Sequence, residues 1–190
     1  MKIGLLFGSF NPIHIGHLII ANSMIDYAKL DQTWLVITPQ SPFKETADLQ
    51  DQGMRLEMVQ SCIEDNPKLF ASDVEFDLPR PNYTIDTLKK LQLDNPHHSF
   101  VLIMGEDNIV NFEKWKSYEQ ILQMVEVFVY PRPNTPDSYF KTHPKVTVVS
   151  CPLLDISSSF IRESIQNKHS IKYMVHSNVE TIISKNNYFL

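Results

Sequence analysis

Residues 8–18 read GSFNPIHIGHL, and this stretch decides the fold. An apolar run at residues 3–7 precedes it and predicts a buried first strand. Apolar side chains at helical spacing predict a helix over residues 19–29; they are Leu18, Ala21, Met24, Ile25 and Ala28. The stretch therefore joins a strand to a helix, and in an open α/β sheet ligands bind where the strands end.

The residue types in this stretch suit a phosphate group. A helix start offers free backbone N–H groups and the positive end of the helix dipole. Gly8 and Gly16 let the backbone approach a ligand closely. The imidazoles of His14 and His17 can donate hydrogen bonds to phosphoryl oxygens. A single histidine here would more often be a capping or packing residue, but two in an H-x-G-H pattern favour a site for a nucleoside triphosphate.

Length and composition narrow the class of protein. A chain of 190 residues predicts one domain over residues 1–190. Its formal charge of −5 argues against a nucleic-acid binder, which would carry a basic excess. Cys62 and Cys151 match no metal or redox spacing and are expected to be reduced, as in a cytoplasmic protein. We expect no signal peptide, no membrane span and no metal held by the protein itself. The sequence leaves a homo-oligomer open.

Strand and helix patterns alternate along the rest of the chain, which predicts an α/β fold with a parallel sheet. Strands are expected at residues 33–38, 69–71, 74–76, 99–104, 125–130 and 146–149. Helices are expected at residues 51–64, 84–93, 157–166 and 175–185. Residues 131–143, with three prolines, are expected to form a mobile loop.

A second motif lies near the carboxyl end, where residues 155–162 read DISSSFIR. Serines ahead of Phe160 and Ile161 indicate a helix cap and first turn. The motif resembles the I-S-S-T-x-I-R element of the nucleotidylyltransferase superfamily, and GSFNP followed by H-x-G-H resembles that superfamily's first signature. The resemblance implies a Rossmann-like, doubly wound parallel sheet with helices on both faces.

The middle of the chain resembles one family within that superfamily, the bacterial nicotinate-nucleotide adenylyltransferases. Residues 82–88, NYTIDTL, are similar to its Y-T-x-D-T-L segment. Residues 104–107, MGED, followed by Trp115 and Tyr118, are similar to its G-x-D and tryptophan segment. Residues 41–44, SPFK, stand where the family has P-P-H-K. Three positions depart from the family pattern: Phe7 for a glycine, Asn11 for an aspartate and Phe43 for a histidine.

The resemblance implies a role for each matching residue. Catalysis would rest on His14, His17, Lys44 and Arg162. ATP would also contact Gly8, Ser9, Phe10, Gly105, Asp107, Ser157, Ser158, Phe160 and Ile161. Nicotinate mononucleotide would contact Thr84, Trp115, Tyr118 and Arg132, with Trp115 stacked on the pyridine ring.

The reaction so implied is adenylyl transfer from ATP to nicotinate mononucleotide, giving nicotinate adenine dinucleotide and pyrophosphate in NAD biosynthesis. Mg²⁺ is expected to arrive with the triphosphate rather than in a protein cage. Another adenylyltransferase of the superfamily, such as one acting on pantetheine phosphate, is the first alternative. A class I aminoacyl-tRNA synthetase fragment fits less well, because the second motif is not K-M-S-K-S. A non-catalytic nucleotide sensor is the alternative from a different class.

Overall fold

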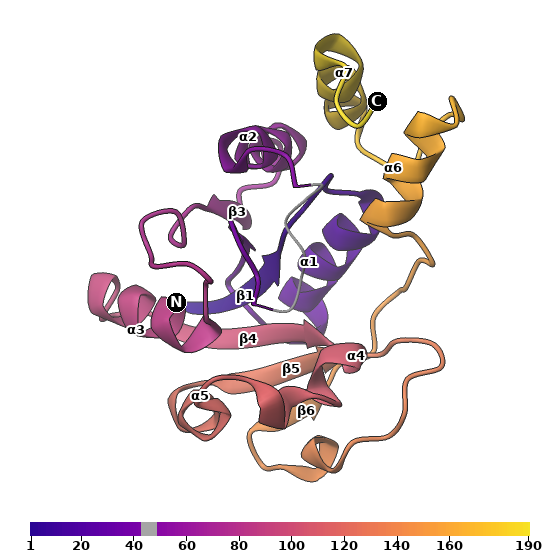
Figure 1. Ribbon diagram of the computed structural model, residues 1–190. Helices are drawn as coiled ribbons and strands as arrows, with labels where there is room; N and C mark the ends of the chain where they lie inside the picture. Colours follow the sequence, from indigo (N-terminus) through magenta and orange to yellow (C-terminus); the bar gives the residue numbers. More distant parts are fainter. Residues whose placement is uncertain (43–48) are drawn as a thin grey trace.

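The computed structural model describes residues 1–42 and 49–190. Its centre is a parallel sheet of six strands in the order β3-β2-β1-β4-β5-β6 (Figure 1). The strands are β1 (Lys2–Gly8), β2 (Gln32–Ile37), β3 (Leu69–Ser72), β4 (Ser99–Gly105), β5 (Glu126–Tyr130) and β6 (Val146–Val148). This order is that of a doubly wound Rossmann-like sheet, so the predicted fold class is confirmed.

Helices cover both faces of the sheet, and the side chains of each strand alternate between them. One face carries α1 (Ile15–Tyr27), α2 (Gln52–Ile63), α6 (Ser158–Gln166) and α7 (Ser177–Asn186). The other face carries α3 (Thr84–Asp94), α4 (Glu106–Ile109) and α5 (Tyr118–Met124), with short 3-10 helices η1 (Phe112–Lys114) and η2 (Tyr139–Thr142). On β1, Leu6 packs under the first group and Leu5 under the second. Figure 1 shows the two groups on opposite sides, with α7 beside α2.

The strand order reverses at β1, which lies between β2 and β4. The connections leaving β1 and β4 run to opposite sides of the sheet, so a crevice opens at the carboxyl ends of these strands. Gly8 is the last residue of β1 and Gly105 the last residue of β4. The 8–18 stretch and the 104–107 segment therefore meet at one edge of the sheet.

Two predicted elements differ from the structure. Helix α1 begins at Ile15, four residues before the expected start, because the extended backbone of His14 caps it. The strand expected at residues 74–76 is wrong. The chain turns there instead, with the Phe76 N–H donating to the Asp73 carbonyl at 2.8 Å. The apolar–polar–apolar pattern of this segment is typical of a strand with one solvent-facing side. It misleads here because Glu75, the polar member, is itself buried.

Candidate active site

The loop that follows β1 folds back on itself. Phe10 has a left-handed backbone, with φ of 45°, and its ring is buried. A Cβ atom at Gly8 would lie 2.8 Å from that ring, so glycine at this position lets the ring pack over the end of β1. The Phe10 ring meets the ring of His17 edge to face, with centroids 5.1 Å apart. The loop thus supports a histidine directly.

The two predicted histidines form one unit at the start of α1. Their rings stack, with centroids 3.6 Å apart and an angle of 25° between the planes. The backbone N–H of His14 donates to Nδ1 of His17 at 3.3 Å. A neutral His17 therefore carries its proton on Nε2 and can donate from that atom. Gly16 between them avoids a tight contact, because a Cβ there would lie 3.1 Å from the His14 ring.

The environment of His14 keeps it uncharged at neutral pH. Its side chain is 6% exposed. Burial lowers the pKa of His14 to about 4, and the positive charge of Arg132 adds to this shift. Among the described residues nothing hydrogen-bonds its Nδ1. His14 is therefore a neutral ring at neutral pH, with its Nδ1 buried.

The second motif meets the first. The Ser158 hydroxyl donates to the Pro12 carbonyl at 2.9 Å, and the Arg162 guanidinium donates to the Asn11 carbonyl at 2.9 Å. Ser157 caps α6 by accepting from the Phe160 N–H at 3.1 Å. The start of a second helix, with its donor groups, thus lies against the phosphate-type loop.

Arg55 holds this edge of the sheet together, and the sequence reasoning missed it. The side chain is buried and donates to three main-chain carbonyls: Ser9 at 2.6 Å, Thr38 at 2.8 Å and Gln50 at 3.0 Å. It therefore links the segments that follow β1 and β2. A signal was present, because Arg55 precedes Met58 by three residues and Val59 by four, which places it on the buried stripe of α2.

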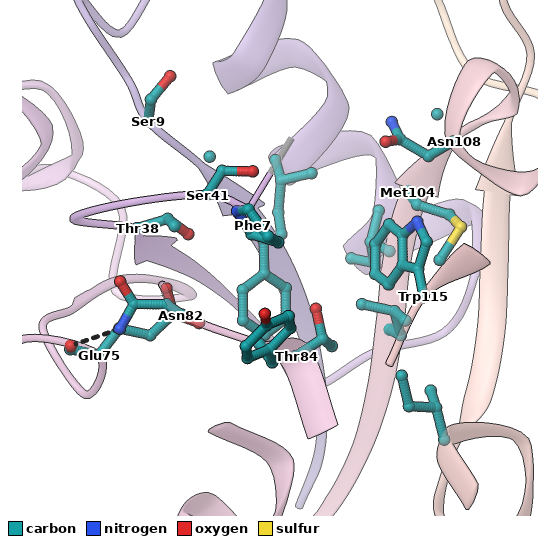
Figure 2. Close-up of a pocket in the computed structure, with 18 of the residues that line it drawn as sticks. Phe7, Ser9, Thr38, Ser41, Glu75, Asn82, Thr84, Met104, Asn108 and Trp115 are labelled. Atoms are coloured by element: carbon teal, nitrogen blue, oxygen red, sulfur yellow. Dashed lines mark hydrogen bonds between the residues drawn. The ribbon is translucent and has the colours of Figure 1, made fainter. Parts of the chain in front are cut away.

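Beside the loop, a pocket opens between the ends of β1 and β4 (Figure 2). Of the predicted site residues, Gly8, Ser9, Thr84, Gly105 and Trp115 line it. In Figure 2, Trp115 and Met104 stand on one side of the pocket, and Thr38, Asn82 and Glu75 stand on the other. The pocket therefore combines an aromatic wall with a polar one.

Phe7 and Glu75 also line the pocket, and the sequence did not predict either of them there. Phe7 brings an aromatic ring to the place where the related family has a glycine. The Glu75 side chain is buried and accepts from the Thr87 hydroxyl at 2.6 Å. Burial raises the pKa of the Glu75 carboxyl, and hydrogen bonds from Thr87 and Thr38 oppose that shift. Asn82 braces the same wall by donating to the Glu75 carbonyl at 3.1 Å.

Three predicted residues lie beside the described pocket wall rather than in it. Tyr118 packs against the rings of Phe112 and Phe140, and its hydroxyl donates to Glu119 at 3.3 Å. Arg132 and Asp107 form an ion pair with 3.8 Å between nitrogen and oxygen. Their substrate contacts stay predictions, and Lys44 and Phe43 lie outside the described residues.

Glu106 anchors the loop that carries Arg132. Its carboxylate accepts from the Arg132 N–H at 3.0 Å and pairs with Lys141. These contacts lower the pKa of Glu106 below its usual value, with the Lys141 hydrogen bond as the main cause. The mobility expected for residues 131–143 stays a prediction.

The described residues show neither a metal-binding cluster nor a membrane-spanning helix. They contain no group of three or more His, Cys, Asp or Glu side chains able to hold a metal ion. Over the same residues, no helix is long and apolar enough to cross a membrane. Cys62 and Cys151 are free thiols.

Comparison with known proteins defines the class of protein and then the family. The model of the cytidylyltransferase-like family matches residues 5–164. A probable nicotinate-nucleotide adenylyltransferase of Cytophaga hutchinsonii is 49% identical, over 100% of this chain and 98% of its own. One of Flavobacterium psychrophilum is 50% identical, over 100% of this chain and 99% of its own.

Solved structures show the same fold. The Plasmodium falciparum nicotinic acid mononucleotide adenylyltransferase complexed with NaAD superimposes with a TM-score of 0.83 at 23% identity, covering 99% of this chain and 97% of that one. The chain is thus a nucleotidyltransferase of the cytidylyltransferase-like class. Within that class it belongs to the nicotinate-nucleotide adenylyltransferase family, so the family resemblance read from the sequence is confirmed.

Proposed function

We propose that this chain transfers the adenylyl group of ATP to the 5′-phosphate of nicotinate mononucleotide, forming nicotinate adenine dinucleotide and pyrophosphate. One observation carries the proposal. The 8–17 loop and the start of α6 join through the Ser158–Pro12 and Arg162–Asn11 hydrogen bonds, beside a pocket walled by Trp115. Two phosphate-type segments next to an aromatic pocket suit two nucleotides placed end to end.

The reaction needs no general base. The acceptor phosphate is ionised at neutral pH, and one of its oxygens attacks the α-phosphorus of ATP. The bond from that phosphorus to the pyrophosphate oxygen breaks, and pyrophosphate leaves with the electron pair. Catalysis then consists of in-line alignment and stabilisation of the charge that develops on the phosphoryl oxygens.

On the phosphate side, we assign the charge-stabilising role to His14, His17, Lys44 and Arg162. His17 suits this role because its Nε2–H donor is fixed by the hydrogen bond at Nδ1. The backbone and hydroxyl donors of the β1 loop and of the α6 first turn would hold the triphosphate; they belong to Gly8, Ser9, Phe10, Ser157, Ser158, Phe160 and Ile161.

On the acceptor side, Trp115 would stack on the pyridine ring, and Thr84, at the start of α3, would lie near its carboxylate. Tyr118 and Arg132 would complete the acceptor contacts. Gly105 and Asp107 would hold the adenosine. The Arg132–Asp107 ion pair is the observation that links these two groups of residues.

The donor set bears on Mg²⁺. The described phosphate side offers imidazoles, hydroxyls and a guanidinium, all of which can donate to phosphate oxygens, and the described residues hold no group of three or more His, Cys, Asp or Glu side chains that could bind a metal ion. We propose that Mg²⁺ is bound mainly by the triphosphate, where it neutralises charge on the leaving pyrophosphate.

We also propose that residues 1–190 form one domain, because side chains of α6 and α7 share a core with those of α1 and α2. The cytoplasmic location stays a prediction.

An acceptor screen tests this proposal. Pyrophosphate release and dinucleotide formation are followed with ATP plus nicotinate mononucleotide, ATP plus pantetheine phosphate, and ATP alone. We expect pyrophosphate and nicotinate adenine dinucleotide in equal amounts with the first acceptor only. Turnover of pantetheine phosphate would favour the alternative enzyme. ATP binding without pyrophosphate release from any acceptor would favour a sensor.

A further inference from the structure

Lys116 links the tryptophan segment, residues 112–118, to the start of α3; both would hold the acceptor. It follows Trp115 directly in the chain. Its Nζ lies 2.8 Å from Oδ2 of Asp86 and 4.4 Å from the centroid of the Tyr83 ring. Tyr83 caps α3, whose first residue is Thr84, and Asp86 lies in the first turn. One ammonium group therefore joins the tryptophan segment to the helix start opposite it.

Two main-chain hydrogen bonds shape the tryptophan segment locally. The Trp115 N–H donates to the Phe112 carbonyl at 3.0 Å, and the Tyr118 N–H donates to the Trp115 carbonyl at 3.2 Å. Ser117 has a left-handed backbone with φ of 55°, so the chain changes direction immediately after Lys116. The rings of Trp115 and Tyr118 also pack on the buried Phe112 ring, in the core that α3 and α5 share, so the Lys116 pair acts in addition to core packing.

We propose that Lys116 is a positioning residue, which adds to core packing in setting the spacing between Trp115 and Thr84 by pairing with Asp86 and Tyr83. The inference deepens the proposed function and rests on it, because it concerns binding of the pyridine nucleotide in this pocket. An ammonium over an aromatic face and beside a carboxylate is held by two attractions of different geometry. Together they fix where Lys116, and hence the neighbouring tryptophan, lies.

A matched control lies on the same helix. Lys90 and Asp94 pair at 2.7 Å near the end of α3, and their side chains are 43% and 41% exposed. The corresponding values for Lys116 and Asp86 are 48% and 41%. The two pairs have the same chemistry and similar exposure, and only the Lys116 pair borders the pocket. Exposed pairs of this kind add little to stability, so neither should move Tm much.

The kinetic test compares Lys116→Met, Asp86→Asn and the double variant with Lys90→Met and Asp94→Asn. We expect the first three to raise KM for nicotinate mononucleotide about fivefold, with kcat and KM for ATP within about twofold of wild type. The KM of the double variant should not exceed that of the single variant with the higher KM, because both changes remove one shared interaction. The two control variants should match wild type.

A second readout needs no turnover. In a Trp34→Phe background, Trp115 is the remaining indole, and its quenching by acrylamide reports how freely it moves. We expect Lys116→Met to increase quenching and Lys90→Met to leave it unchanged. If nicotinate mononucleotide is not a substrate, the proposed function fails, and this measurement still tests the positioning role.

Three results would overturn the inference. One is unchanged quenching in Lys116→Met. Another is an equal change in the control pair. The third is a rise in KM for nicotinate mononucleotide, with quenching and the KM for nicotinamide mononucleotide, which has an amide in place of the carboxylate, both unaffected; this would show direct recognition of the carboxylate by the ammonium group.

Discussion

The two sides of the site are held in place by different kinds of contact. On the phosphate side, Arg55, Ser158 and Arg162 all donate to main-chain carbonyls of the segments that follow β1 and β2. On the acceptor side, buried hydrogen bonds brace the wall around Glu75, but the link from Trp115's neighbour to α3 is the Lys116–Asp86 pair, whose side chains are about half exposed. Main-chain carbonyls at strand ends cannot move without the sheet, whereas exposed ion pairs are weak and screened by salt. The side to which we assign the reacting phosphates is thus the more rigid one.

The largest expected effect tests the phosphate side. His17→Ala should lower kcat by about 10²–10³-fold, because it removes a fixed donor from the place where charge develops. Its Tm should stay near that of wild type, since His17 is only partly buried. Steady-state kinetics beside a thermal melt measure both quantities. An active variant, or one that is merely unfolded, would remove His17 from the mechanism.

The same substitution on each side compares their rigidity. Arg55→Met leaves three main-chain carbonyls without their donor, that of Thr38 in a buried place, and should lower the free energy of unfolding by about 3 kcal/mol or more. Lys116→Met should lower it by less than about 1 kcal/mol. Urea unfolding of the two variants gives the values. Similar losses of unfolding free energy in the two variants would contradict the difference in rigidity between the two sides.

His14 gives the phosphate side a pH dependence. Its pKa is about 4 in the folded chain against the ordinary histidine value of 6.5, so between these pH values only the unfolded chain binds the proton. The free energy of unfolding should therefore fall by about 3 kcal/mol from this group as pH drops from about 6.5 to 4. His14→Gln should show a flatter profile over that range in urea unfolding. Parallel profiles for wild type and variant would contradict the buried, uncharged His14.

Arg162 tests whether the α6 side serves ATP. Arg162→Lys should raise KM for ATP several-fold and KM for the acceptor less, because lysine cannot reproduce the guanidinium fork that donates to Asn11 and faces the phosphate loop. Steady-state titration of each substrate at saturating levels of the other separates the two constants. Equal increases, or none, would place Arg162 outside the triphosphate site.

Much of this fold was predictable because most strands are apolar runs bounded by turn residues, and the paired motifs identify the superfamily. The errors come from buried polar groups. Glu75 gave residues 74–76 the alternation of a strand, although its burial follows from a turn that brings it to Thr87. Arg55 lies on the apolar stripe of α2, where a charge is ordinarily read as solvent-facing.

The candidate site was predictable in its motifs but not in its spacing. Tertiary packing brings together residues about 150 positions apart in the chain, so that Ser158 reaches Pro12 and Arg162 reaches Asn11. The Lys116–Asp86 pair is equally invisible to local patterns, because its two residues are ordinary surface charges until the chain folds. Residue type indicated the chemistry, and only the fold shows which groups meet.

Comparison of nicotinate mononucleotide with its amide counterpart tests the account most directly, since it asks at once whether adenylyl transfer occurs and whether the acceptor side selects. The two acceptors differ only in carboxylate against amide. Hydroxyl and N–H donors near Thr84 and Tyr118 would favour the carboxylate. We expect kcat/KM for the acid to exceed that for the amide by at least about tenfold, with pyrophosphate and dinucleotide formed in equal amounts. Equal use of the two acceptors, preference for the amide, or no transfer to either would contradict the account.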